Sequence, residues 1–495
     1  MKKTIFLAAF LLKLSSLFSQ QIYESLIPDQ GECVVFLTAC DWGACVEKIL
    51  ICTEKKWTPD QIHAEDFDVD RLLYSTEELP GLTKGQLTVT DAFTSDEYGR
   101  KTESPSSFIT ITTDLHPAAE NSNPFLAKTF KGKIRSYYGY KVENDELDFT
   151  IKKLKGFVNR EASKFSTSRF NYVFPSSDEK ITMNYAYFIP EKKEASEEKI
   201  PLILWFHGMG ESGNNINSVI FGTKTSAFLS EKIQSHFSGG IALLAPQCPT
   251  GWLETTEIGK GNIRVWEPFD KDGTIDRVKN PVKNFFGTVF ALDEGVKTKS
   301  SEEESPKKDE EESEKTPYAA VSWYTEPVLA LLNDFLDQHP EIDRKRIYTG
   351  GCSAGGYMTV NMMIQKGELF AAAFPVCEYY LDSKITNAQI DMLSQKALWF
   401  TYSLNDESVR PEKCSLPTIA RLKKAGSKNL HLSEFKKVID TSGKYLLNRE
   451  AGKDDSDYGL PYEYEGHASW IYLFNDECKE KELNLFDWLS SQTLD

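Results

Sequence analysis

The 495-residue chain has few of the residues that make metal sites, with seven histidines and nine cysteines. None of them lies at the spacing of a zinc site, and the His-Glu-x-x-His pattern is absent. We therefore expect the protein to need neither a metal nor a cofactor. Basic residues are outnumbered, with 57 Lys and Arg against 74 Asp and Glu. Because phosphate binding depends on Lys and Arg, the net charge of -17 argues against nucleic acid as a partner.

A run long enough to span a membrane is also lacking. Residues 1–3 are basic, residues 4–12 are apolar, and Ser16–Gln20 offers small residues for cleavage. This order is typical of a secretory signal peptide and is too short for a confident membrane span. We therefore predict that residues 1–20 are removed and that the mature protein, secreted or periplasmic, has no membrane span.

The remaining length can hold two domains, and 40% of the residues are hydrophobic, enough for a large core. Residues 21–155 contain short apolar runs separated by turn residues, which predicts an all-β sandwich without an identifiable catalytic group. The runs are Val34–Leu37, Lys48–Ile51, Phe108–Thr112 and Asp148–Ile151. Residues 156–495 form the second predicted domain.

A serine in the second domain lies between glycines, in the sequence Gly-Cys-Ser-Ala-Gly at residues 351–355. An apolar run at 346–349 precedes it and a helix-like stretch at 356–363 follows. Strand, tight turn and helix in this order form a nucleophile elbow, which presents a serine to a base and to a helix N-terminus. A plain Gly-Ser-Gly loop is the alternative, and the surrounding residues favour the elbow with Ser353 as nucleophile.

The other parts of an acyl-transfer site follow in the order that an α/β-hydrolase requires. Upstream, an apolar strand at 201–206 runs into His207-Gly208-Met209-Gly210, a loop that can donate a backbone N–H to an oxyanion hole beside that of Ala354. Downstream, Asp406 follows the apolar run 397–402 and is the candidate acid, and His467 is the candidate base. Alternatives for the acid are Asp382, Asp391 and Asp440. His207 is an alternative base, although a structural role suits it better, as it does Glu211 and His431.

These segments resemble bacterial exported esterases of the α/β-hydrolase superfamily, in the group of feruloyl esterases, polyhydroxybutyrate depolymerases and predicted peptidases. The matching segments are Phe206–Glu211, Leu244–Pro249, Arg346–Tyr348 leading into Cys352–Tyr357, Phe374–Cys377 and Gly466–Trp470. The resemblance implies an α/β fold of the hydrolase type. It also implies that Ser353 is the nucleophile, His467 the base, Asp406 its orienting acid, and Met209 and Ala354 the oxyanion donors.

The first domain is similar to the immunoglobulin-like N-terminal domain that some esterases of this group carry. The segments that match are Asp41–Gly43, Phe67–Val69, Thr90–Phe93, Phe108–Thr112 and Asn123–Phe125. Four cysteines lie here, Cys33, Cys40, Cys45 and Cys52. A hairpin turning at residues 41–44 would place the outer two and the inner two opposite one another, and export permits a disulfide at one of these pairs.

Two insertions enlarge the hydrolase. Residues 297–317 are acidic, too polar to pack, and predicted to be a solvated loop. The apolar segments Val265–Phe269 and Phe285–Phe290 before it are candidates for a partial lid. The second insertion, Ile439–Glu465, precedes His467 and contains four tyrosines that suit an aromatic or sugar-bearing substrate or simply pack in a loop: Tyr445, Tyr458, Tyr462 and Tyr464.

The leading hypothesis is an exported serine carboxylic-ester hydrolase acting on short-chain or aromatic esters, such as feruloyl or acetyl esters, free or linked to polysaccharide. The alternatives are a serine peptidase like prolyl oligopeptidase and a non-catalytic binding protein. A peptidase of that group places a large propeller before the hydrolase, and residues 21–155 are too few to supply one. The oligomeric state does not follow from the sequence.

Deleting Lys297–Lys315 and closing the gap with a short Gly/Ser linker should preserve folding and hydrolysis of short esters, because this composition offers almost no apolar area to bury. Circular dichroism and an assay with p-nitrophenyl acetate measure both. Loss of activity on this smallest ester would show that the segment helps to build the site.

Overall fold

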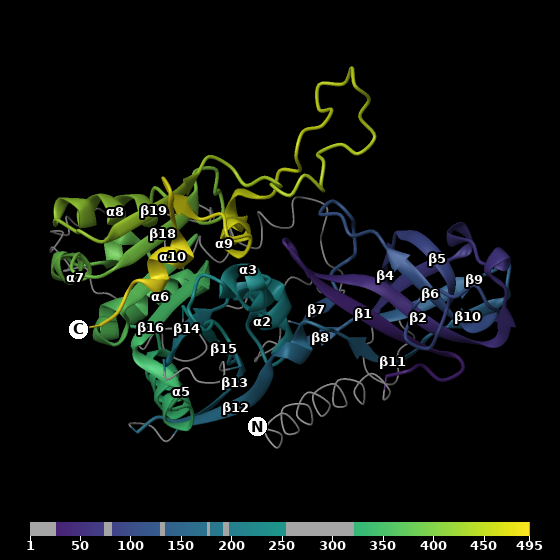
Figure 1. The fold of residues 1–495 in the computed structure, drawn as a ribbon, viewed down its shortest axis with the longest axis horizontal. Helices are drawn as coiled ribbons and strands as arrows, with labels where there is room; N and C mark the ends of the chain where they lie inside the picture. Colours follow the sequence, from purple (N-terminus) through teal and green to yellow (C-terminus); the bar gives the residue numbers. More distant parts are fainter. Residues whose placement is uncertain are drawn as a thin grey trace, which may run out of the picture. The chain divides into compact units, whose positions relative to one another are not determined.

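The computed structural model describes residues 26–73, 82–128, 134–175, 179–191, 198–253 and 321–494 (Figure 1). They form two compact units. The first holds the described residues within Met1–Ala127, Arg135–Ser166 and Ile220–Ser226, and the second holds the others. The predicted signal peptide, the acidic insertion and the two candidate lid segments all lie outside the described residues.

The first unit is built from two sheets. One orders its strands β11-β1-β2-β6-β5 and the other β10-β9-β3-β4. The strands are β1 (Glu32–Cys40), β2 (Gly43–Trp57), β3 (Asp68–Leu73), β4 (Leu82–Leu87), β5 (Val89–Ser95), β6 (Ser106–Thr113), β9 (Gly139–Asn144), β10 (Phe149–Ile151) and β11 (Lys153–Val158). A separate two-stranded sheet pairs β7 (Phe125–Lys128) with β8 (Ile134–Tyr137).

The two sheets share one hydrophobic core. Ile49 and Ile111 from the first sheet pack in the same buried cluster as Val69 and Val142 from the second. Alternate residues of these strands face the core, so the alternation of apolar residues in the sequence is what makes them strands with one buried face. The predicted β-rich N-terminal region is therefore present, and its immunoglobulin-like character stays a prediction.

The cysteine pairing expected from the sequence is wrong. The turn contains two residues, Asp41 and Trp42, so Cys45 pairs with Thr38 and not with Cys40. A shift of register between Phe36 and Leu37 then places Cys33 opposite Ile51 in place of Cys52. All nine cysteines are free. The shorter turn and the irregularity in the ladder, neither of which changes the apolar pattern, explain the difference.

The second unit contains an eight-stranded sheet in the order β12-β13-β15-β14-β16-β17-β18-β19. Its strands are β12 (Ser166–Val173), β13 (Lys180–Phe188), β14 (Ile200–Phe206), β15 (Ala242–Gln247), β16 (Ile342–Cys352), β17 (Ala372–Val376), β18 (Leu398–Ser403) and β19 (Leu430–Phe435). β13 runs antiparallel to β15, and the strands from β15 to β19 are parallel. This mostly parallel sheet is the predicted α/β-hydrolase architecture.

Helices cover both faces of this sheet, so β14, β15, β17 and β18 are buried along their whole length. The helices are α2 (Asn217–Gly222), α3 (Glu231–Gln234), α5 (Thr325–Gln338), α6 (Ala354–Lys366), α7 (Asn387–Leu393), α8 (Ser415–Lys424), α9 (Trp470–Phe474) and α10 (Leu485–Ser490). A short hairpin of β20 (Lys479–Glu480) and β21 (Leu483–Asn484) precedes α10. No helix of the described residues is long and apolar enough to cross a bilayer.

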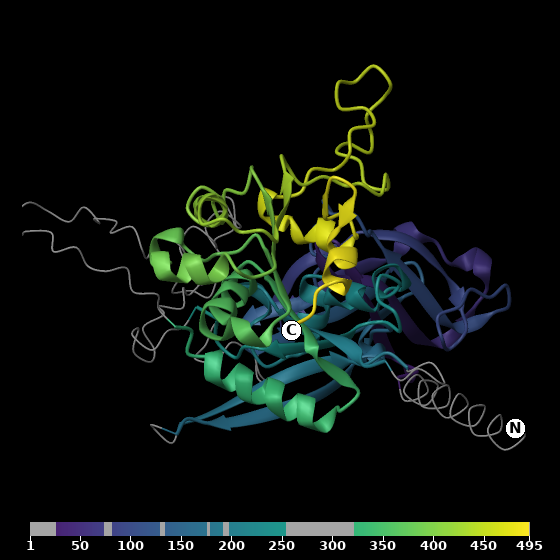
Figure 2. The same cartoon turned by 60° about the vertical axis from the view of Figure 1, so that its left-hand side comes forward.

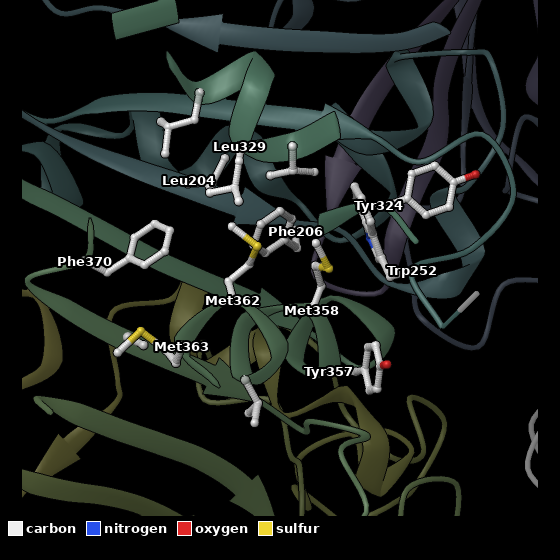
Figure 3. Close-up of a cluster of buried hydrophobic side chains, with 14 of the residues drawn as sticks. Leu204, Phe206, Trp252, Tyr324, Leu329, Tyr357, Met358, Met362, Met363 and Phe370 are labelled. Atoms are coloured by element: carbon white, nitrogen blue, oxygen red, sulfur yellow. The ribbon is translucent and has the colours of Figure 1, made fainter. Parts of the chain in front are cut away.

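The two faces of β14 show how the sheet fixes α6. Leu204 and Phe206 lie in one buried cluster with Met358 and Met362 of α6 (Figure 3). On the other face, the Trp205 ring packs against Phe228 at 5.1 Å and against Phe474 of α9 at 5.4 Å between centroids. Every residue of β14 is therefore held by packing, which fixes the end of the strand where the candidate site begins.

A histidine between two carboxylates ties α3 to the C-terminal region. The ring of His236, just after α3, contacts Asp487 through Nδ1 at 2.7 Å and Asp476 through Nε2 at 3.0 Å. Burial alone would lower the pKa of His236, but the hydrogen bonds to Asp487 and Asp476 outweigh it and raise the pKa above 6.5. The protonated ring is thus the form that stabilises the fold.

His236→Gln should lower Tm by about 2–4 °C at pH 5.5, since ~1 kcal/mol is lost with a charged hydrogen-bond partner. The contribution is fully present below the unfolded pKa of 6.5 and disappears as the pH rises through the raised folded value, so the effect should shrink by pH 9. Calorimetry measures it, with the exposed His63→Gln as control. Equal losses at both pH values would contradict the charged bridge.

Candidate active site

Ser353 occupies the turn between β16 and α6, as the sequence predicts. Its φ of 57° and ψ of -119° lie in a region that residues with a side chain rarely adopt. Such a strained turn raises the hydroxyl above the ends of the strands, next to the N-terminus of a helix. The side chain is buried, and its Oγ has no hydrogen-bond partner among the described residues.

Two glycines allow this turn to lie against the end of β14. A Cβ on Gly355 would lie 2.0 Å from the carbonyl oxygen of Phe206, and a Cβ on Gly351 would lie 2.6 Å from the same atom. Both distances are shorter than any that Cβ atoms normally show, and the obstructing atom is backbone. The Gly-x-Ser-x-Gly pattern is therefore a packing requirement as well as a turn signal.

The loop after β14 faces the elbow. A Cβ on Gly208 would lie 3.7 Å from the carbonyl oxygen of Cys352. Met209 begins the short helix η4 (Met209–Glu211), and Ala354 is the first residue of α6. N–H groups in the first turn of a helix have no partner within the helix, so these two positions can direct N–H groups at an anion. Their role as oxyanion donors stays a prediction.

His207 is structural, in agreement with the preferred interpretation of the sequence. Its Nε2 accepts a hydrogen bond from the backbone N–H of Cys248 at 2.9 Å, and its Nδ1 contacts the carbonyl oxygen of Gly208 at 2.6 Å. The indole of Trp252 donates to the carbonyl oxygen of His207 at 2.9 Å. The ring is fully buried and holds two loops together, so it does not serve as the base.

Asp406 and His467, 61 residues apart, meet in the interior. Nδ1 of His467 lies 2.7 Å from Oδ2 of Asp406, and both side chains are almost fully buried. Oδ1 of Asp406 accepts the backbone N–H groups of Ser408 at 2.9 Å and Val409 at 2.7 Å, which fixes the carboxylate. A neutral imidazole whose Nδ1 donates to a carboxylate has its lone pair on Nε2 and can accept a proton there.

Close backbone packing brings these loops together. Gly466, in front of His467, lies so near Asn405 that a Cβ would be 2.2 Å from the Asn405 carbonyl oxygen. The backbone N–H of Ser353 donates to the carbonyl oxygen of Val376 at 3.0 Å, and that of Cys377, after β17, donates to the carbonyl oxygen of Thr401 in β18 at 2.8 Å. Burial raises the pKa of the Cys377 thiol, so we expect it to be unreactive. The loops bearing Ser353, Asp406 and His467 thus converge on one edge of the sheet.

The alternative acids are engaged elsewhere. Asp382 accepts hydrogen bonds from Thr418 and Arg421, both at 2.9 Å. Asp440 caps its own loop through Ser442 and Tyr445. Asp391 is exposed on α7. Asp406 is the carboxylate that contacts His467.

The insertion before His467 forms an arm, residues 439–465. Its base is closed by hydrogen bonds from Asp440 N to Tyr462 O and from Tyr464 N to Val438 O, both 2.8 Å, and Glu465 accepts from the Ser408 hydroxyl at 2.7 Å. The rest of the arm projects from the helices and strands of its unit in both views (Figures 1 and 2). Tyr464 is buried at the base, whereas Tyr458 is half exposed.

One buried carboxyl beside the site escaped the sequence interpretation. Glu378 follows β17 and is only 1% exposed. Burial raises its pKa to about 8, against the opposing effect of hydrogen bonds from Tyr380 and Ser415. A single glutamate within the otherwise apolar run 374–381 was the signal that could have identified it.

Comparisons with known proteins give one family match and several similar structures. Residues 325–380, which include the elbow, match the prolyl oligopeptidase family. A thermostable esterase has a similar structure, with a TM-score of 0.58 and 17% identity over 93% of this chain and 99% of that chain. Two other structures are more distant. A ferulic acid esterase has a TM-score of 0.33 and 11% identity over 55% of this chain and 90% of that chain. The acylaminoacyl peptidase of Pyrococcus horikoshii has a TM-score of 0.34 and 13% identity over 79% of this chain and 50% of that chain. No curated protein matches.

The thermostable esterase shows the α/β-hydrolase fold, and at such low identity it shows the fold alone. The match of residues 325–380 covers the nucleophile segment and is consistent with the elbow around Ser353. The chain is therefore a serine hydrolase. Its substrate and the roles of individual residues are not given by these similarities.

Gly355→Ala should lower the free energy of unfolding by about 3 kcal/mol and abolish turnover, because the new Cβ must push α6 away from β14. Thermal unfolding and ester hydrolysis measure the two effects. Gly367→Ala, at the other end of α6, is the matched control, since its Cβ would lie 3.4 Å from the flexible Lys396 side chain. Near-normal stability of the Gly355 variant would refute the tight contact.

Proposed function

We propose that the protein is an exported serine carboxylic-ester hydrolase that works through an acyl-enzyme. The observation that carries the proposal is the buried pair of His467 Nδ1 and Asp406 Oδ2 at 2.7 Å, on loops that converge on the strained Ser353. In a solvent-free environment this pair fixes the tautomer that a general base needs. Export is proposed from the N-terminal sequence alone.

In the first half-reaction, Nε2 of His467 takes the proton of the Ser353 hydroxyl as Oγ attacks the ester carbonyl. The backbone N–H groups of Met209 and Ala354 stabilise the oxyanion of the tetrahedral intermediate. Asp406 stabilises the imidazolium that forms. The imidazolium then gives its proton to the leaving alcohol, which departs and leaves the acyl group on Ser353.

In the second half-reaction, a water molecule replaces the alcohol. His467 takes a proton from the water as its oxygen attacks the acyl carbon, and collapse of the second intermediate returns that proton to Ser353. The carboxylic acid is released and the enzyme regains its first state.

Short-chain and aromatic esters, including feruloyl and acetyl groups on polysaccharide, are the proposed substrates. The half-exposed Tyr458 lies on the arm that ends at His467, and an exposed aromatic ring can stack on an aromatic acyl group or a sugar. Initial rates with p-nitrophenyl esters of increasing length and with methyl ferulate would rank these classes.

A peptidase is the second candidate, because residues 325–380 match the prolyl oligopeptidase family. Amide hydrolysis uses the same groups, so the site itself does not separate the two. The N-terminal unit has sheets of five and four strands among its described residues, which does not suggest the four-stranded blades of a propeller. Cleavage of peptide anilides at rates comparable to p-nitrophenyl esters would favour the peptidase.

Ser353→Ala should abolish labelling by a fluorophosphonate and lower kcat by about 10⁴–10⁶-fold, with Tm within a few degrees of wild type. Gel fluorescence, stopped assays and calorimetry measure the three quantities. Ser427→Ala, a serine after α8, is the control and should keep both labelling and turnover. Near-normal turnover of the Ser353 variant would end the proposed mechanism.

A further inference from the structure

The loop after β17 supports the nucleophile through its backbone. The N–H of Ser353 donates to the carbonyl oxygen of Val376 at 3.0 Å, and the N–H of Tyr379 donates to the carbonyl oxygen of Ser353 at 3.3 Å. Cys377 between them has a φ of 36°, an unfavourable value for a residue with a side chain. The loop that supports the strained elbow is therefore itself strained. Its conformation must be stabilised by further contacts.

Glu378 sits at the centre of this loop. A Cβ on Gly356 of α6 would lie 2.6 Å from the Cβ of Glu378, so the glutamate packs directly on the nucleophile helix. Its Oε2 accepts the N–H of Tyr380, and the Tyr380 ring stacks on Tyr357 of α6 at 4.9 Å between centroids. Glu378 therefore contacts the first turn of α6 directly through its Cβ and indirectly through the ring of Tyr380.

The other side of the carboxyl group reaches α8. The hydroxyl of Ser415, the first residue of α8, donates to Oε1 of Glu378 at 3.0 Å. A hydroxyl can donate to a carboxylate or, after rotating, accept from a carboxylic acid, so the contact suits either protonation state. Glu378 therefore connects the loop below the nucleophile to a second helix.

Among the residues that the structure describes, no cation forms an ion pair with this carboxyl group, and the nearby Arg421 is engaged by Asp382 at 2.9 Å. The titratable groups around Glu378 are Asp382 after β17, Tyr380 in its own loop, and Cys414 before α8 with its neighbour Lys413, while Tyr357 of α6 stacks on Tyr380. An ionised Asp382 disfavours a second negative charge here, and Tyr380, Cys414 and Tyr357 are neutral at moderate pH.

We propose that protonated Glu378 is a positioning residue for Ser353, and that its ionisation loosens the loop that holds the nucleophile. The proposal rests on the serine-hydrolase function above and adds a proton-controlled step to it. A charge at a site that is 1% exposed has only two neutral donors, so ionisation favours any rearrangement that admits water. The enzyme should then lose nucleophile reactivity on the alkaline side, with the pKa of about 8 setting the position of the loss.

The stability of the fold should respond to the same proton. Because the folded pKa of Glu378 lies above its ordinary value of 4.5, the stabilisation is fully present below pH 4.5 and is lost as the pH rises through about 8. Glu378→Gln keeps the shape and an acceptor oxygen but carries no charge. The Tm of wild type should therefore fall relative to that of the Gln variant across this range.

The test measures the rate of fluorophosphonate labelling of the full chain between pH 6 and 9.5. Between pH 7 and 9.5 the protonated fraction of a group with a pKa of about 8 falls by about 30-fold, so the wild-type rate should fall towards this factor. Glu378→Gln should change by less than about twofold relative to its own rate at pH 7. Glu434→Gln, an exposed carboxylate bonded to Tyr402, is the control and should behave as wild type.

A second variant decides the question if the Gln variant does not fold. The Ser415 hydrogen bond lowers the pKa of Glu378, so Ser415→Ala should move the alkaline loss to higher pH. A flat wild-type profile, or an unchanged alkaline loss in Glu378→Gln or Ser415→Ala, would overturn the positioning role. Absence of labelling at every pH would instead count against Ser353 as the nucleophile, which separates failure of the proposed function from failure of this inference.

Discussion

The site depends on one contact, the approach of the first turn of α6 to the end of β14. Gly351 and Gly355 leave no atom between the turn and the carbonyl oxygen of Phe206. This contact holds Ser353 in its unfavourable backbone conformation and sets the loop of Gly208 opposite the helix N-terminus. The sheet thereby positions the Ser353 hydroxyl and the N–H groups at the starts of η4 and α6 before any substrate is present.

The parts of the site that the sequence predicted are those with a local signal. An apolar strand directly precedes both Ser353 and His207, so the residues that identify them lie within a few positions. Asp406 likewise follows a wholly buried strand. Parallel strands end at one edge, so their order along the chain was enough to expect Asp406 and His467 to meet there. The identity of the acid among four aspartates was open in the sequence, and long-range packing of Gly466 on Asn405 explains which one lies beside the histidine.

What the sequence could not provide depends on register and burial. The cysteine pairs of the first unit failed because a two-residue turn and a ladder irregularity leave the apolar pattern unchanged. Glu378 was missed because a charged residue suggests an exposed position, and only the fold places it under the nucleophile helix. The first miss reflects the register of one hairpin, and the second reflects burial by elements that are distant in the chain.

The closed base of the arm has a consequence for how far the arm can vary in length and sequence. Because backbone bonds between Val438, Asp440, Tyr462 and Tyr464 join the two strands of the arm where it leaves the unit, the chain enters and leaves at nearly one point. The entropy of loop closure grows slowly with length, so residues beyond this point can be lengthened or exchanged at small thermodynamic cost. We therefore expect that the residues beyond the base can be replaced with little effect on the position of His467.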